Sequence, residues 1–334
     1  MRIADVPEYL RIAHKAGLSA FLKGPPGMGK TTLAREYAKK AKLRLINVHA
    51  PLVDLLDIKG VISTYNDEAK FLPLQIWPKA DDDPVLVLID EFPQCVPAIQ
   101  NGFSQLLIEQ IMGDVRLPKG SFVCATGNRK EDRAATHNIN AHVVSRVMHM
   151  EMEKDHDAFW NWAASNKVHP HVIAYTKFSP DALMTFDPAK SQDPYATYRS
   201  WEYVSNVLKT NPQERFIREC VAGLVGKGVA TTFMAFRDTC ANLPDPQQAL
   251  NHPHSFVAPS DPGVMNAICI SLAYQVDDKT GDNFVILAGK IPVENAFMML
   301  AYASRHWTGM KKNKSIKDWI AQHAQLIADS TWDI

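Results

Sequence analysis

The feature that most constrains this chain is a glycine-rich loop near the amino terminus, Gly24-Pro25-Pro26-Gly27-Met28-Gly29-Lys30-Thr31. Its spacing of glycine, four residues, glycine, lysine and serine or threonine is typical of loops that hold phosphates. Residues 18–22 before it predict a short buried strand, and residues 32–41 after it predict a helix. The alternative is a glycine-rich turn that binds nothing, and such a turn does not need a strand before it and a helix after it. The sequence therefore predicts the strand, loop and helix of a nucleotide-binding α/β domain.

The residue types of the loop suit phosphate chemistry. Glycines let the backbone turn so that its N–H groups face inward, at the positive end of the following helix. Lys30 has the length to reach the β- and γ-phosphates, and the Thr31 hydroxyl can take a site on Mg²⁺. The loop is therefore predicted to bind a nucleoside di- or triphosphate with magnesium.

Composition places the chain among ordinary globular proteins, since 46% of its 334 residues are hydrophobic and 22% are charged. Lys+Arg and Asp+Glu both total 36, so the chain lacks an overall basic footprint for nucleic acid. No apolar run approaches the ~20 residues that span a bilayer, and the amino terminus has no signal-peptide core. The five cysteines are dispersed along the chain, which is typical of reduced thiols. We therefore expect a soluble, cytoplasmic protein.

Strands and helices alternate through the first half of the chain. Strands are predicted over residues 43–48, 84–89 and 121–125, an inserted hairpin or loop over 60–72 and an amphipathic helix over 97–112. This alternation predicts a mostly parallel sheet covered on both faces. Beyond residues 152–156 helical patterns take over: 158–166, 201–208, 212–225, 264–276, 293–304 and 316–328. Residues 242–262 and 279–283 read as loops, the first because it holds five prolines.

Polar residues follow two of the predicted buried strands. Asp90 and Glu91 come after the run 84–89, and Asn128 comes shortly after the strand 121–125. At such a strand end one carboxylate supports Mg²⁺ and the next accepts a proton from the attacking water. We therefore predict Asp90 as the metal-side acid, Glu91 as the general base and Asn128 as the residue that orients the water.

Taken in order, five segments resemble the motifs of the AAA+ ATPases, and most closely those of the bacterial and phage-encoded MoxR-type branch. They are residues 24–31, 85–91, 125–128, Ser145-Arg146-Val147 and Tyr198-Arg199-Ser200-Trp201. The resemblance covers about residues 1–230, whereas residues 240–334 resemble no family. It implies an α/β P-loop fold with a five-stranded parallel sheet in the order five, one, four, three, two, followed by a helical lid. The corresponding domains are 1–153, a lid over 154–240, and a mainly helical region over 241–334 that extends the lid or belongs to it.

The resemblance also implies ATP and Mg²⁺ as ligands, and subunits in a ring, usually a hexamer. The nucleotide would be held by Gly24, Pro25, Pro26, Gly27, Met28, Gly29, Lys30, Thr31 and Thr32. Arg146 stands where the family has an arginine that reaches the γ-phosphate of the neighbouring subunit, and Arg129 and Arg133 are rivals for that role. Arg199 matches the lid arginine called sensor two, although Tyr198 replaces the proline that usually precedes it.

Residues 60–78 and 113–119 lie where the MoxR-type branch has pore-facing insertions that handle a client. Phe71, Leu72 and Trp77 are the apolar candidates for client contact, and local packing under the insertion is the alternative.

The implied function is ATP-driven remodelling of a protein client, for which a von Willebrand A-type protein is the usual companion. Two alternatives stay open: a motor or loader on nucleic acid, and a nucleotide-binding switch that does not hydrolyse ATP.

Overall fold

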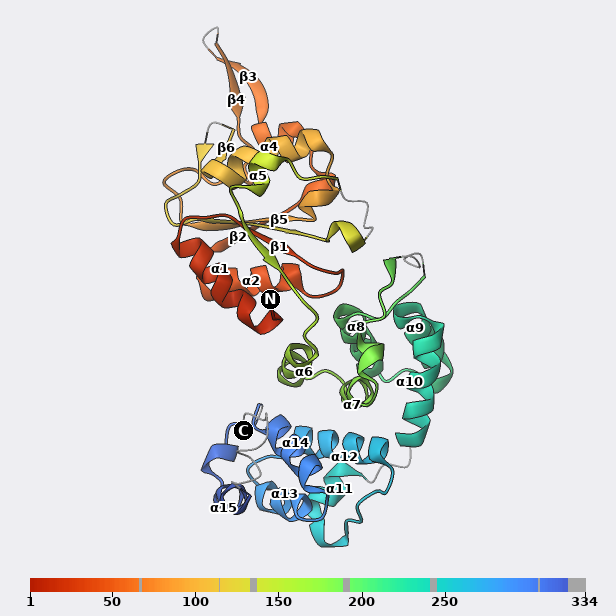
Figure 1. Ribbon diagram of the computed structural model, residues 1–334. Coiled ribbons are helices and arrows are strands. Elements are labelled where there is room, and N and C mark those ends of the chain that lie inside the picture. The colour runs from red at the N-terminus through yellow and green to blue at the C-terminus, as the bar shows by residue number, and fades with distance from the viewer. Residues whose placement is uncertain are drawn as a thin grey trace. The chain divides into compact units, whose positions relative to one another are not determined.

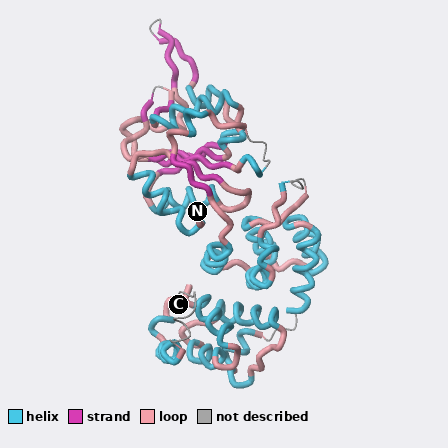
Figure 2. Tube along the Cα trace, in the orientation of Figure 1, coloured by secondary structure: helices cyan, strands magenta, loops and turns pink. Residues whose placement is uncertain are grey.

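The computed structural model describes residues 1–65, 68–113, 115–132, 137–188, 193–240, 245–305 and 307–323. The chain divides into two compact units (Figure 1). The first is Met1–Asp155 with Phe186–Ser191, and the second is His156–Thr185 with Gln192–Ile334. The first unit holds the strands, whereas the described part of the second is helices and loops (Figure 2).

A five-stranded parallel sheet forms the centre of the first unit. Its strands are β1 (Ala20–Lys23), β2 (Arg44–His49), β5 (Val85–Asp90), β8 (Phe122–Gly127) and β9 (Met148–Glu151). Their spatial order, β2-β5-β8-β1-β9, is two, three, four, one, five when these strands are numbered along the chain. This order confirms the predicted topology. β5 and β8 lie inside the sheet and are buried along almost their whole length, which explains their continuous apolar sequences.

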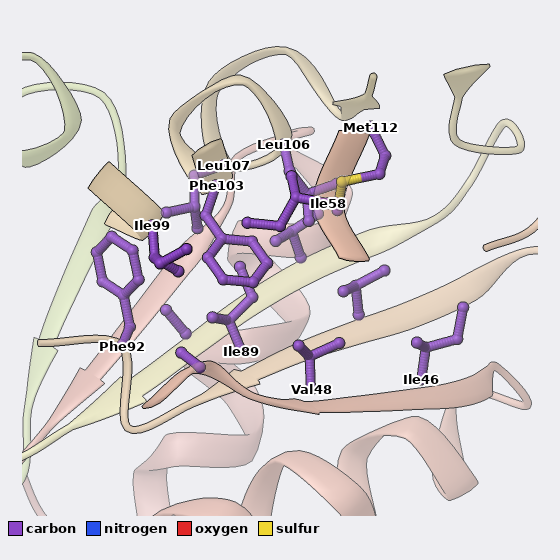
Figure 3. Close-up of a cluster of buried hydrophobic side chains, with 14 of the residues drawn as sticks. Ile46, Val48, Ile58, Ile89, Phe92, Ile99, Phe103, Leu106, Leu107 and Met112 are labelled. Carbon is purple, nitrogen blue, oxygen red and sulfur yellow. The ribbon is translucent and has the colours of Figure 1, made fainter. Parts of the chain in front are cut away.

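Helices cover both faces of the sheet (Figure 1). On one face lie α1 (Val6–Lys15) and α2 (Lys30–Lys40); on the other lie α4 (Pro97–Glu109) and α5 (Ala141–Val144), with α3 (Leu55–Lys59) beside α4. Between the sheet and α4, aliphatic side chains from the strands meet Phe103, Leu106 and Leu107 of the helix (Figure 3). This core fixes the strands, so the residues at their carboxyl ends have defined positions.

Two small hairpins complete this unit. β3 (Val61–Tyr65) pairs antiparallel with β4 (Glu68–Leu72), which confirms the predicted hairpin. β6 (Ile111–Met112) pairs with β7 (Val115–Arg116), at the place expected for the second insertion. The helix predicted over residues 97–112 is too long, because Gln110 adopts a left-handed conformation (φ 57°) that ends α4 and turns the chain into β6.

The second unit is built from the helices α6 (His156–Ser165), α7 (Pro170–Phe178), α8 (Tyr198–Lys209), α9 (Glu214–Val225), α10 (Lys227–Cys240), α11 (Pro246–Asn251), α12 (Pro262–Gln275), α13 (Gly281–Ala288), α14 (Val293–Ala303) and α15 (Lys314–Gln322). α12 is buried on nearly every side and packs against α7 and α14. None of the helices in the described ranges is long and apolar enough to cross a membrane.

Both loops predicted in this unit overlap a helix. α11 lies within residues 242–262, where Asp245 accepts hydrogen bonds from the backbone N–H groups of Gln247 and Gln248. Pro246 takes the first position of that helix, where proline's missing N–H costs nothing. α13 begins at Gly281, inside the second predicted loop. In the first case a proline was interpreted as a helix breaker where it marks a helix start.

Candidate active site

The phosphate loop joins the end of β1 to the start of α2. Gly27 and Gly29 have φ values of 75° and 85°, in the left-handed region that favours glycine. Gly29 immediately precedes α2, so the unpaired N–H groups of the first helical turn lie beside the loop. The local backbone therefore has the form of an anion-binding loop at a helix amino terminus.

Lys30 lies across this loop and is 9% exposed. Its ammonium group donates to the carbonyl oxygens of Gly24 at 2.6 Å and Pro25 at 2.8 Å. It also donates to Asn128 Oδ1 at 2.9 Å, which joins the loop to the residue after β8. The structure thus brings together the predicted phosphate-binding lysine and the predicted water-orienting amide, although 98 positions separate them in the chain.

Thr31 and Asp90 also meet. The Thr31 hydroxyl donates to Asp90 Oδ1 at 2.9 Å, so an oxygen donor from α2 lies beside a carboxylate at the end of β5. The Thr126 hydroxyl donates to the same carboxylate oxygen. Beneath the site, burial raises the pKa of Cys124 to about 12, and the neighbouring Asp90 contributes to the rise. Cys124 is therefore an uncharged core residue at neutral pH.

Glu91 follows Asp90 in a left-handed conformation with φ 58° and ψ 36°. Its backbone N–H points to the Thr126 hydroxyl at 3.4 Å, and its carbonyl accepts from Gln94 N at 2.9 Å. The residue is half-buried, and its carboxylate has no hydrogen bond or ion pair to any described residue. A left-handed bend at this point turns the chain out of the strand, so Glu91 ends the sheet at the edge where Asp90 and Asn128 lie.

The candidate arginines differ in their surroundings. Arg129 donates to both oxygens of Asp132, which is 3% exposed, and also pairs with Glu131 and Glu151. The hydrogen bonds to Asp132 raise the pKa of Arg129. Arg146 lies just beyond α5, is exposed, and its side chain has no ion pair or hydrogen bond within the described ranges. Arg133 lies outside the described residues.

Arg199 belongs to the second unit and is exposed in the first turn of α8. That helix starts without the proline expected before the arginine, because Thr197 and Ser200 form a capping box at its amino terminus. Tyr198, in place of the proline, is buried and stacks on Phe159 with ring centroids 5.1 Å apart. The capping box therefore provides a helix start directly before Arg199, although the proline is absent.

One member of the hydrogen-bonded cluster, Thr126, was not predicted from the sequence. It reads there as one more β-branched residue of a buried strand. Its place in the segment 125–128, two residues before Asn128, is the sequence feature that points to the site. Lys30 contacts Asn128 directly, Thr31 contacts Asp90 directly, and Glu91 follows Asp90 in the chain. Arg146 makes no hydrogen bond or ion pair with them in the described chain.

Residues 20–172 match the model of the "ATPase family associated with various cellular activities (AAA)". Two solved structures of Thermotoga maritima RuvB are similar to the chain. The RuvB Holliday junction branch migration motor has 16% identity over 80% of each chain, with a TM-score of 0.39, and a mutant of the same protein has 13% identity over 80% of each chain, with a TM-score of 0.38. No curated protein matches. The match of residues 20–172 to the AAA ATPase model indicates that the chain is an ATP hydrolase.

Proposed function

We propose that this enzyme is a ring-forming AAA+ ATPase of the MoxR-type branch that couples ATP hydrolysis to the remodelling of a protein client. One observation carries the proposal: two consecutive residues that follow the glycines of the phosphate loop each form a hydrogen bond to a residue at a neighbouring strand end. The links are Lys30 to Asn128 and Thr31 to Asp90. These two links support a site in which phosphate, metal and water ligands would lie at one edge of the sheet.

The loop residues bind the nucleotide in this proposal. The backbone N–H groups of residues 27–32 face the phosphates, and Lys30 contributes a positive charge at the β- and γ-phosphates. The Thr31 hydroxyl and the Asp90 carboxylate would hold Mg²⁺, because this ion prefers oxygen ligands and is commonly bound by one or two carboxylates together with substrate phosphates. When bound, Mg²⁺ neutralises charge on the phosphates.

Glu91 and Asn128 act on the attacking water. Asn128 orients the water, and Glu91 accepts one of its protons while its oxygen attacks the γ-phosphorus. The bond from that phosphorus to the β–γ bridging oxygen breaks, which gives ADP and phosphate. Lys30 stabilises the negative charge that develops on the phosphate oxygens.

The exposure and ion pairs of Arg146 and Arg129 support hydrolysis at a subunit interface. Arg146 is exposed and unpaired within the described chain, so it is available to the nucleotide of a neighbouring subunit in a hexameric ring. Arg129 is less suited, because releasing it would leave Asp132 buried without its cation. In this scheme Arg199 contacts the γ-phosphate of its own subunit as sensor two.

The β3–β4 hairpin supports a protein as the client. Val61, Ile62, Phe71 and Leu72 are between 41% and 60% exposed. Val61 is directly opposite Leu72, and Ile62 is directly opposite Phe71. Exposed apolar side chains that gather on one element are typical of protein-binding surfaces. A von Willebrand A-type protein is the proposed companion.

Substitution Glu91→Gln tests the hydrolysis site. It removes the proton acceptor while keeping the shape of the side chain, so we expect turnover to fall by roughly 10²–10⁴. The affinity for ATP, measured by titration with a fluorescent analogue, should stay within about twofold, because the binding residues are intact. Glu36→Gln, on the exposed face of α2, is the matched control. Unchanged hydrolysis in Glu91→Gln would remove Glu91 as the base.

The same variant tests the client. Glu91→Gln loaded with ATP should remain in its ATP-bound form and retain the client during a pull-down, and ring assembly should be visible by light scattering. A monomer at all ATP concentrations would contradict the ring. Stimulation of the wild-type ATPase by DNA, with a steep dependence on salt, would instead favour a nucleic-acid motor.

A further inference from the structure

Thr126 is a buried member of the site to which the sequence analysis assigns no role. It is the fifth residue of β8 (Phe122–Gly127), is 1% exposed, and lies opposite Leu22 of the neighbouring strand β1. A hydroxyl buried at this depth is costly unless it is hydrogen-bonded. Both of its partners, Asp90 and Glu91, are residues for which we propose a direct role in hydrolysis.

The first contact concerns the carboxylate of Asp90. Thr126 and Thr31 both donate to Oδ1, the latter at 2.9 Å. In the part of the chain that the structure describes, no group donates to Oδ2. Two donors on one oxygen fix the rotation of the carboxylate, and they leave the other oxygen available for a ligand. Hydroxyl donors to a charged acceptor make comparatively strong hydrogen bonds.

The second contact concerns the backbone of Glu91. A non-glycine residue with φ 58° and ψ 36° has an unfavourable conformation, which persists only when its surroundings hold it. The Thr126 hydroxyl lies 3.4 Å from the Glu91 N–H, and the Gln94 N–H holds the carbonyl of the same residue at 2.9 Å. Thr126 therefore contacts the backbone from which the proposed base projects.

We propose that Thr126 is a positioning residue for ATP hydrolysis. Its one hydroxyl sets the rotation of the Asp90 carboxylate and supports the left-handed backbone of Glu91, so that the metal ligand and the base keep one relative geometry. This inference rests on the proposed roles of Asp90 and Glu91. Thr126 itself touches neither water nor nucleotide in this scheme.

The sharpest test compares Thr126→Ser with Thr126→Cys, which differ only in whether oxygen or sulfur is present. Serine keeps the hydroxyl donor, whereas a thiol is a weak donor. We expect kcat to stay within about threefold in Thr126→Ser and to fall about 10–100-fold in Thr126→Cys, as for other residues that orient metal ligands. Thr126→Val should resemble the cysteine variant. Thr176→Val, in the buried part of α7, controls for losing a buried hydroxyl elsewhere.

A second readout separates positioning from folding. In Thr126→Cys the affinity for ATP without Mg²⁺ should be unchanged within about twofold, because the loop is intact. The further rise in melting temperature when Mg²⁺ is added to the ATP complex should be smaller than in the wild type, because Asp90 is less well oriented. Thr126→Ser should retain that further rise.

Equal kcat and equal Mg²⁺-dependent melting shifts in the serine and cysteine variants would overturn the inference. If Thr126→Val fails to fold, the serine and cysteine pair still decides, since both are small and uncharged. Failure of the proposed function looks different: Glu91→Gln would then hydrolyse ATP normally. Normal hydrolysis in Thr126→Cys beside a strong loss in Glu91→Gln would remove Thr126 alone.

Discussion

The strand ends of the central sheet and the β3–β4 hairpin belong to the same unit but are stabilised in opposite ways. At the strand ends, hydrogen bonds link Lys30 to Asn128 and Thr126 to Asp90, which come from distant parts of the chain. The hairpin is an isolated two-stranded ribbon whose apolar side chains Ile62 and Phe71 remain exposed. Two-stranded ribbons of this kind are marginal without support at the base.

This difference matches the two proposed roles, which are ATP hydrolysis at the strand ends and client binding at the hairpin. Hydrolysis needs groups fixed within fractions of an ångström, which buried hydrogen bonds provide. In the proposed function, binding of a protein client would use accessible apolar surface, and the hairpin exposes Ile62 and Phe71. Trp77 marks the boundary, because it is 7% exposed and donates to the Asp57 carbonyl at 2.8 Å in the core under the hairpin. The prediction of Trp77 as a client contact was therefore wrong, and its alternative, local packing, was right.

The largest effect on turnover is expected at Arg146, which we propose acts on the nucleotide of a neighbouring subunit. Arg146→Ala should lower turnover by ~10³–10⁵, the range known for such arginines, and should leave ATP binding intact. Arg129→Ala is the contrast, because removing it leaves Asp132 buried without its cation and should lower the free energy of unfolding by about 1–3 kcal/mol. Full turnover in Arg146→Ala together with a large loss of turnover in Arg129→Ala would mean that Arg129, and not Arg146, is the arginine that reaches the neighbouring nucleotide.

A smaller effect is expected at the boundary between the two regions. Trp77→Ala removes a buried ring and should lower the free energy of unfolding by about 3–5 kcal/mol, measured by urea denaturation. Trp77→Phe keeps an aromatic ring but loses the hydrogen bond to Asp57, so the loss should be closer to ~1 kcal/mol. A stability loss below about 1 kcal/mol in Trp77→Ala would mean that the boundary is drawn in the wrong place.

The smallest effect on stability is expected on the hairpin itself. Ile62→Ser combined with Phe71→Ser should change the free energy of unfolding by only about 0.5 kcal/mol, because both side chains are already exposed. The same double variant, placed in the Glu91→Gln background, should lose the captured client. Retention of the client would detach the hairpin from the proposed function. A large loss of stability would show that the ribbon is part of the core.

Much of the sheet was predictable, because strands buried on both faces leave continuous apolar runs such as residues 84–89. The phosphate loop was predictable for a different reason, since glycine, lysine and threonine are each required by chemistry at a fixed spacing. The two helices that overlap the predicted loops were missed because proline and glycine can either break a helix or stand at its start, as Pro246 and Gly281 do.

Contacts between distant residues set the limit of prediction at the site. Nothing local to Thr126 indicates that its hydroxyl meets Asp90, which lies 36 positions earlier. Likewise, the sequence offers Phe71 and Trp77 as similar aromatic residues, and only the fold leaves the first exposed and buries the second. The three candidate arginines could not be ranked by their partners before the pairing of Arg129 with Asp132 was known.

The most direct test of the central claim is complementation between two inactive variants. In the proposed ring, a Glu91→Gln subunit can supply Arg146 to a neighbouring Arg146→Ala subunit that has an intact Glu91. Each variant alone should be nearly inactive, and an equal mixture, assembled with ATP, should recover about a quarter of the wild-type turnover, because about a quarter of random interfaces hold both residues. A mixture as inactive as its components would contradict a site shared between subunits.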